Sequence, residues 1–356
     1  MKTFHCTHCQ NLVFFENVRC LSCDHSLAFL PDQNRMAALE QGEDRLWRQP
    51  NSGSGDRGYK LCLNYVEHNV CNWAVPGEDP SLLCSSCRLT RVIPDLNQPG
   101  NHAAWYRLEV AKRRLIYALM SFKLPLVGKS EQAPTGLAFE FLNDTTKPNG
   151  DRSRVMTGHD NGLITINVAE ADDLYREHQR TRQGEPYRTL LGHFRHESGH
   201  YYWDQLIQTG PRLAQFRAVF GDERADYQQA LKQHYGNGPL VNWERDFISA
   251  YASSHPWEDW AESWAHVLHM SDAVETAQSM GLSMRPQRAD EPSLERLPKA
   301  LTPADAAFDL MIQSWFSLTF MLNNLTRGLG LADGYPFGLS ARVTEKLRFV
   351  FETMTP

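Results

Sequence analysis

One short segment carries residue types that can perform hydrolytic chemistry. It is His196-Glu197-Ser198-Gly199-His200, two histidines four positions apart with a glutamate after the first. Residues four apart on a helix share a face, so both imidazoles can ligate one Zn²⁺ while Glu197 points at the remaining coordination position. The apolar spacing predicts a helix over residues 186–208, which Thr209-Gly210-Pro211 would end. We expect His196 and His200 to be metal ligands and Glu197 to be catalytic.

A hydrolytic zinc also needs a third protein ligand and an open position for water. Glu258 and Glu262 follow Pro256, a residue that suits the first turn of a new helix, and they lie one turn apart on one face. Glu258 is the predicted third ligand. Glu262 is predicted to accept the free ring N–H of a ligand histidine and to fix its tautomer.

A competing third ligand lies between these two segments. Glu223 stands 23 residues after His200, and Asp226 follows it closely. The residue one turn after Glu223 is Tyr227, however, so no carboxylate is placed to orient a ligand histidine. We keep Glu223 and Asp226 as alternatives to Glu258. The remaining histidines near the motifs are expected to be packing or substrate-side groups: His193, His255 and His266.

The cysteines form two further candidate metal sites. All 8 lie within the first 87 residues, in two sets: Cys6, Cys9, Cys20 and Cys23, then Cys62, Cys71, Cys84 and Cys87. Paired Cys-x2-Cys units let thiolates from tight turns ligate a tetrahedral Zn²⁺, so the first set predicts a structural zinc. The second set is looser, and either His68 or His5 is an alternative to one of its cysteines. Reduced cysteines without a metal are the remaining alternative for both sets.

Composition and charge limit the class of protein. The chain has 356 residues, of which 42% are hydrophobic and 22% charged, as is ordinary for a folded protein. No apolar run is long enough to span a membrane, and Cys6 comes before any signal-peptide core could fit, so we expect a cytoplasmic protein. The net charge is -6, and residues 1–98 carry 9 basic against 11 acidic side chains, which argues against a nucleic-acid partner.

The pattern along the chain predicts an α+β fold. We expect zinc-ribbon modules at residues 1–33 and 58–98, joined by a linker at 34–57 whose core is Asn51-Ser52-Gly53-Ser54-Gly55-Asp56. The linker composition predicts that the two modules are separate units. Residues 99–356 are expected to form a mainly helical domain with a small β-sheet.

Local patterns place the first elements of the helical domain. Apolar spacing predicts a helix over about residues 103–124, with the basic run Lys112-Arg113-Arg114 on a solvated face. Strands are expected at residues 137–142, 154–157 and 163–168, the last two joined in a hairpin by Asn161-Gly162. The strand at 163–167 is either an edge that pairs with an extended substrate or an interior strand.

These motifs together carry a family resemblance. His196-Glu197-x-x-His200 followed by Glu258-x-x-x-Glu262 resembles the gluzincin clan, whose members take a glutamate ligand and a later carboxylate from a second helix. Tyr251, seven residues before Glu258, is similar in spacing to a tyrosine of the lethal-factor-like peptidases that assists catalysis. Over essentially all 356 residues the chain resembles a bacterial family of zinc-binding metallopeptidases, through its ribbons and the segments Asp160–Asn167, Gly192–Trp203, Phe220–Arg224 and His255–Glu262.

The resemblance implies a zincin-like metallopeptidase domain and a zinc-dependent hydrolase. Glu197 would assist the attack of a zinc-bound water on a peptide bond, and Tyr251 would donate a hydrogen bond to the developing oxyanion. We expect one catalytic and two structural Zn²⁺, a peptide or protein substrate, and no membrane. The ribbons are expected to hold the chain's own N-terminus or a protein partner. The alternative is a non-catalytic zinc-stabilised scaffold that binds proteins, and ribbon-mediated nucleic-acid binding is a third hypothesis.

Overall fold

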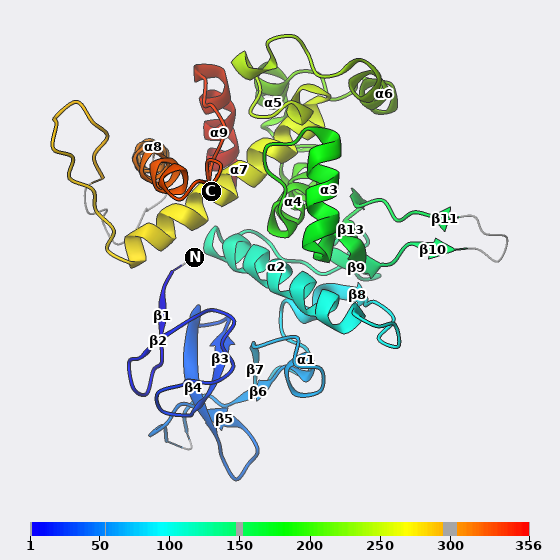
Figure 1. The fold of residues 1–356 in the computed structure, drawn as a ribbon. Helices are drawn as coiled ribbons and strands as arrows, with labels where there is room; N and C mark the ends of the chain where they lie inside the picture. The colour runs from blue at the N-terminus through cyan, green and yellow to red at the C-terminus, as the bar shows by residue number, and fades with distance from the viewer. Residues whose placement is uncertain (1, 54, 147–151, 295–304, 356) are drawn as a thin grey trace.

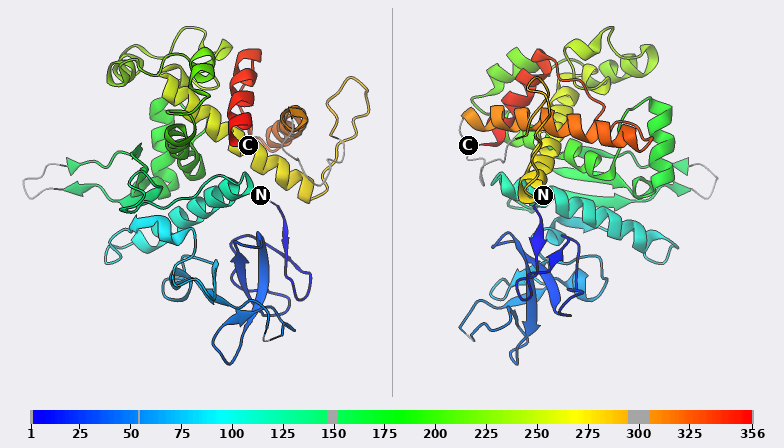
Figure 2. Two further views of the ribbon diagram at one scale, coloured as in Figure 1. Left: turned by 180° about the vertical axis from the view of Figure 1, so that it is seen from behind. Right: turned by 60° about the vertical axis from the view of Figure 1, so that its left-hand side comes forward.

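The computed structural model describes residues 2–53, 55–146, 152–294 and 305–355. A β-rich N-terminal unit lies at one end of the molecule and a mainly helical domain at the other, with helix α2 between them (Figures 1 and 2). The expected α+β class, ribbons followed by a mainly helical domain with a small sheet, is confirmed. No helix in the described ranges combines the length and the apolarity that a membrane crossing requires.

The N-terminal unit is built from short strands. Its elements are β1 Phe4–His5, β2 Leu12–Val13, β3 Ser26–Leu30, β4 Arg35–Gln41, β5 Trp47–Arg48, β6 Tyr59–Leu61, α1 Leu63–Val66, β7 Ala74–Pro76 and the 3₁₀ turn η1 Cys87–Leu89. Strands β3 to β7 form one five-stranded antiparallel sheet in chain order, and β1 pairs with β2 in a separate ribbon.

Residues 34–57 do not form the linker that the sequence pattern predicts. They contain β4 and β5, and β4 places four successive buried apolar residues, Met36-Ala37-Ala38-Leu39, in the core. A continuous apolar run of this kind is typical of a strand that is buried on both faces. Because one sheet runs from the first cysteine set to the second, the two sets belong to one folded unit. A turn at residues 42–46 joins β4 to β5, and the Gly/Ser segment between β5 and β6 is a loop, in which Ser54 lies outside the described residues.

Strand pairing crosses the expected domain boundary at residues 98 and 99. Strand β8 Thr90–Val92 directly follows the second cysteine set, yet it pairs in parallel with β9 Ala138–Leu142 of the helical domain. The chain therefore enters the second sheet before residue 98. A three-residue strand has too short a pattern to be recognised from sequence.

The sheet of the helical domain has the order β12-β13-β9-β8. Its strand β13 Leu163–Asn167 lies between β9 and β12, so the interior alternative is confirmed and the edge alternative is wrong. The edges are β8 and β12 Gly158–Asp160, and β12 lies later in sequence than the expected strand at 154–157. Asn161 and Gly162 both have positive φ, 45° and 86°, and they make the two-residue turn that the Asn-Gly pair predicts. A separate ribbon pairs β10 Thr145–Thr146 with β11 Arg152–Ser153.

Helices make up the rest of this domain. They are α2 Asn101–Ser121, η2 Val168–Ala171, α3 Asp173–Gln183, α4 Leu190–Leu206, α5 Leu213–Phe220, α6 Tyr227–Asn237, η3 Trp243–Arg245, η4 Tyr251–Ser253, α7 Pro256–Ser279, α8 Asp305–Gly328 and α9 Ala341–Met354. The expected helices over 103–124 and 186–208 are confirmed as α2 and α4. Helix α4 starts later than expected because the Thr189 side chain caps it, accepting a hydrogen bond from the Gly192 N–H at 3.0 Å.

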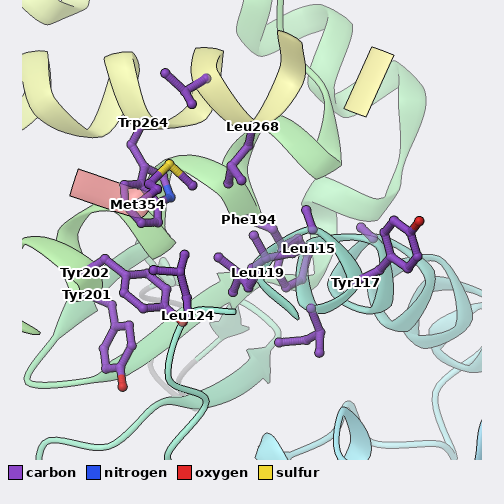
Figure 3. Packing of buried hydrophobic residues seen from close by; sticks show 14 of the residues in the cluster. Leu115, Tyr117, Leu119, Leu124, Phe194, Tyr201, Tyr202, Trp264, Leu268 and Met354 are labelled. Atoms are coloured by element: carbon purple, nitrogen blue, oxygen red, sulfur yellow. The ribbon is translucent and has the colours of Figure 1, made fainter. Parts of the chain in front are cut away.

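The core of the helical domain lies where four helices meet. Figure 3 shows buried side chains from α2, α4, α7 and α9 pointing toward one another. They include Leu115, Leu119, Phe194, Trp264, Leu268 and Met354. Burial of such apolar side chains contributes about 1.5–3 kcal/mol each, so this cluster fixes α4 against α7.

Two of the three cations of the basic run in α2 are buried, which corrects the expected solvated face. Lys112 is 0% exposed and Arg113 is 1% exposed. Nζ of Lys112 lies 2.8 Å from a carboxylate oxygen of Glu109, one turn earlier, and Lys112 also bonds the hydroxyl of Thr90 on β8. A buried ion pair is stable when further hydrogen bonds satisfy its remaining polar atoms. The Thr90 hydroxyl provides one of these bonds, because it donates to Oε1 of Glu109.

The other two cations of the run join α2 to the N-terminal unit. The Arg113 guanidinium donates to the carbonyl oxygen of Val70 at 2.6 Å, and Arg114 pairs with Glu16 at 2.6 Å. Their partners lie 43 and 98 residues away in sequence. A local pattern therefore could not distinguish this buried interface from a solvated helix face.

We predict that Lys112→Met destabilises the protein by about 3–5 kcal/mol, because Glu109 would remain buried without its cation. The free energy of unfolding in urea measures this effect. The double variant Glu109→Gln/Lys112→Met should recover most of the loss, since it leaves no uncompensated charge. Equal destabilisation of the single and double variants would contradict the assigned ion pair.

Candidate metal centre

Helices α4 and α7 cross in close contact at Gly199. A Cβ atom at this position would lie 2.9 Å from the Cα of Ala261, a distance that real structures essentially never show. Two indole N–H groups of α7 bridge the crossing: Trp260 donates to the Gly199 carbonyl at 2.8 Å, and Trp264 donates to the Ser198 hydroxyl at 3.0 Å. The crossing brings the start of α7 beside the two histidines of α4.

The first turn of α7 is fixed by a histidine cap. Nδ1 of His255 accepts the N–H of Trp257 at 3.1 Å, and Nε2 lies 3.1 Å from the carbonyl oxygen of Ala225. Since a carbonyl can only accept, Nε2 is the protonated nitrogen and the ring is neutral. Pro256 occupies the first helical position, as expected. His255 thus caps the helix that carries Glu258.

Three of the predicted ligands converge at this point. Nε2 of His196 lies 3.0 Å from Oε2 of Glu258 and 3.2 Å from Nε2 of His200, and the His200–Glu258 distance is 3.6 Å. Around a tetrahedral Zn²⁺ with bonds of about 2.0–2.1 Å, ligand atoms are about 3.3 Å apart. Oε2 of Glu258 is buried and has no hydrogen-bond partner. The geometry and the unpaired oxygen both fit a zinc ion held by these three residues.

Glu262 lies where the sequence predicts it. One carboxylate oxygen lies 2.7 Å from Nδ1 of His196, and the other accepts a hydrogen bond from the Ser249 hydroxyl at 2.7 Å. A carboxylate at Nδ1 holds the proton there and leaves Nε2 free as a ligand atom. Ser249 was not singled out from sequence, because nothing in its spacing indicates a partner 13 residues later.

Electrostatics at the centre favours charged carboxylates. Burial would raise the pKa of Glu258, but the neighbouring His200 and His196 hold it well below its usual range. Burial likewise opposes ionisation of Glu262, yet the hydrogen bond from His196 lowers the pKa of its carboxyl. Two ionised carboxylates beside two imidazoles form a strongly cation-attracting site.

The two predicted catalytic side chains border the ligands. Glu197 is 7% exposed, and within the described ranges its carboxylate makes no hydrogen bond or ion pair. The ring of Tyr251 lies 5.9 Å from that of His196. Burial and the nearby Glu258 raise the pKa of Tyr251 well above its usual value, so the phenol keeps its proton and can donate it in a hydrogen bond.

The competing ligands lie elsewhere. Glu223 is bound by the guanidinium of Arg217 at 2.9 Å, and Asp226 caps α6 by accepting the N–H of Gln229 at 3.0 Å. Neither belongs to the metal-competent cluster of the described residues. His193 and His266 also have other partners. His193 lies 3.2 Å from Glu170, and the buried His266 lies 2.8 Å from the Tyr335 hydroxyl.

Two residues near the ligands were missed from sequence. Tyr227 donates to Oε1 of Glu258 at 2.6 Å, and the ring of His159 on β12 stacks on that of His200 at 6.5 Å. In the sequence, Tyr227 was considered only because it stands one turn after Glu223, where a carboxylate would be needed to orient a ligand histidine. Its distance of 31 residues from Glu258 gives no periodic signal that could have found it.

The cysteine sets form two compact clusters in the N-terminal unit. The four Sγ atoms of each set lie within 4.8 Å of one another, and neither His5 nor His68 joins them. Sγ pairs are 3.6 Å apart in the first set and 3.8 Å in the second, far beyond a disulfide bond of about 2.05 Å. Around a tetrahedral zinc with Zn–S bonds of about 2.3 Å, sulfur atoms are about 3.8 Å apart, so both clusters fit zinc.

We predict that Gly199→Ala destabilises the protein by about 1–3 kcal/mol, because the new methyl group forces α4 away from Ala261. Gly236→Ala is the matched control, since nothing lies within 4 Å of a Cβ at that helical position. The control should be neutral or slightly stabilising. Free energies of unfolding measure both variants, and equal stabilities would show that the crossing is not tight.

Comparisons with known proteins identify the family of each part of the chain. Residues 101–353 match the family described as "Putative zinc-binding metallo-peptidase", and residues 3–98 match a zinc-ribbon domain. Uncharacterized proteins of Mycobacterium tuberculosis and Mycobacterium bovis are 42% identical over 351 residues, covering 98% of this chain and 94% of theirs. No solved structure matches the chain. The chain therefore belongs to this family of zinc-binding metallopeptidases and carries an N-terminal zinc ribbon.

Proposed function

We propose that the protein is a zinc-dependent peptidase of the gluzincin type that holds one catalytic and two structural Zn²⁺. The observation that carries the proposal is the convergence of His196, His200 and Glu258 on one point, with Glu197 beside them and free of any partner in the described ranges. A metal site that only stabilised the fold would not need the carboxylate of Glu197, which is buried beside the ligands and forms no hydrogen bond or ion pair in the described ranges.

Each side chain has a defined task in this proposal. Zinc bound by His196, His200 and Glu258 would supply Lewis-acid chemistry, activating water and stabilising negative charge. Glu197 takes the proton of the attacking water on its carboxylate and then gives it to the leaving amine. The Tyr251 hydroxyl, which stays protonated, donates a hydrogen bond to the oxygen of the scissile carbonyl as that oxygen gains charge.

The substrate is proposed to be an extended peptide that adds to β12. This strand is one of the two edges of the sheet, and the ring of its His159 stacks over that of His200 on α4. A peptide that pairs with the outer side of β12 would therefore pass beside the zinc ligands. Main-chain hydrogen bonds would give affinity with little dependence on side chains.

The alternative function is a non-catalytic scaffold that uses the zinc sites for stability and binds a protein partner. Such a scaffold requires the metal ligands but neither the general base Glu197 nor the phenol of Tyr251. The placement of Glu197 and Tyr251 around the ligands favours the peptidase, although a shared fold alone would not.

We predict that Glu197→Gln lowers hydrolysis of a peptide library by about 10²–10⁴-fold, the usual contribution of a general base. The variant should keep the zinc content of the native protein, because Glu197 is not a ligand. Liquid chromatography of the cleaved peptides and elemental analysis measure the two effects. A variant that lost its metal, or that still cleaved peptides, would overturn the role of Glu197. A native protein that cleaved no peptide would favour the scaffold.

A further inference from the structure

The carboxylate of Glu258 has its two oxygens in different environments. Oε1 accepts the hydroxyl of Tyr227 at 2.6 Å. Oε2 has no hydrogen-bond partner and lies 3.0 Å from Nε2 of His196. The phenol therefore occupies one oxygen and leaves the other facing the histidines.

This hydrogen bond cannot be replaced by solvent. Glu258 is 1% exposed, so water does not reach Oε1. A buried carboxylate oxygen that loses its donor bears the full desolvation cost, unless it finds another partner. The nearest cation site is the one formed with His196 and His200, so Oε1 would turn toward a metal there and compete with Oε2 for it.

The chain places Tyr227 against the same turn that positions Glu258. Tyr227 begins α6, directly after the capping residue Asp226. Its ring packs on His255 at 5.2 Å and on Trp257 at 5.8 Å, the two residues on either side of Pro256. Ring packing and the hydroxyl contact are separate interactions, so a phenylalanine keeps the first and loses only the second.

We propose that Tyr227 is a positioning residue for the catalytic metal. Its hydroxyl holds Oε1 of Glu258 so that Oε2 alone is presented to zinc, which keeps one coordination position open. The inference rests on the zinc site of the proposed function but not on hydrolysis. Partners that orient a ligand in this way typically contribute 10–100-fold to metal affinity.

The test is the zinc affinity of Tyr227→Phe. Protein with both cysteine clusters loaded and the third site emptied is titrated with zinc against a chromophoric chelator of known affinity. We expect the variant to bind zinc at the third site 10–100-fold more weakly than the native protein. Its zinc content in the cysteine clusters and its far-ultraviolet circular dichroism should be unchanged, since the ring packing remains.

Tyr235→Phe is the matched control on the same helix. Both tyrosines belong to α6, but it is the hydroxyl of Tyr227 that donates to Glu258. The control should bind zinc with native affinity. Native affinity in Tyr227→Phe, or an equal loss in both variants, would overturn the inference. Because no hydrolysis is measured, a protein that binds zinc but cleaves no peptide would refute the peptidase and leave this inference standing.

Discussion

The contact between α4 and α7 at Gly199 sets the positions of the proposed zinc ligands. One helix supplies both histidines, and the other supplies Glu258 and the carboxylate that orients His196. A side chain at residue 199 would collide with the backbone of Ala261, so glycine is required for this approach. The indoles of Trp260 and Trp264 then hold the helices together through hydrogen bonds to α4. Since a metal site tolerates only small errors in ligand position, this crossing is the constraint on which the site depends.

The N-terminal unit is attached to the same framework through α2. Small β-rich units have little core, and two cysteine clusters that fit zinc compensate for this. The buried cations of α2 contact both parts of the molecule: Lys112 reaches Thr90 on β8, and Arg113 reaches Val70 beside the second cluster. Helix α2 also packs in the core with α4 and α7 (Figure 3), so the ribbon unit is part of one continuous structure with the helical domain.

Site residues could be predicted from sequence where all residues of a motif lie on one helix or in one pair of turns. His196 and His200 share a helix face, Glu258 and Glu262 share another, and the cysteine spacings indicate their own clusters. Residues that contact each other across distant segments have no regular spacing in the sequence by which they could be recognised. Tyr227, Ser249 and the burial of Lys112 depend on partners that only the folded chain brings near. Short strands such as β8 and β12 were missed or misplaced for a related reason, since three residues cannot show a period.

The proposed zinc content is three ions per chain, one held by His196, His200 and Glu258 and one in each cysteine cluster. Elemental analysis of protein purified without added metal measures it directly, beside the variant Glu258→Ala. We expect three zinc ions per native chain and two in the variant, because removal of one buried ligand leaves only two histidines at the site. Two zinc ions in both proteins would contradict it.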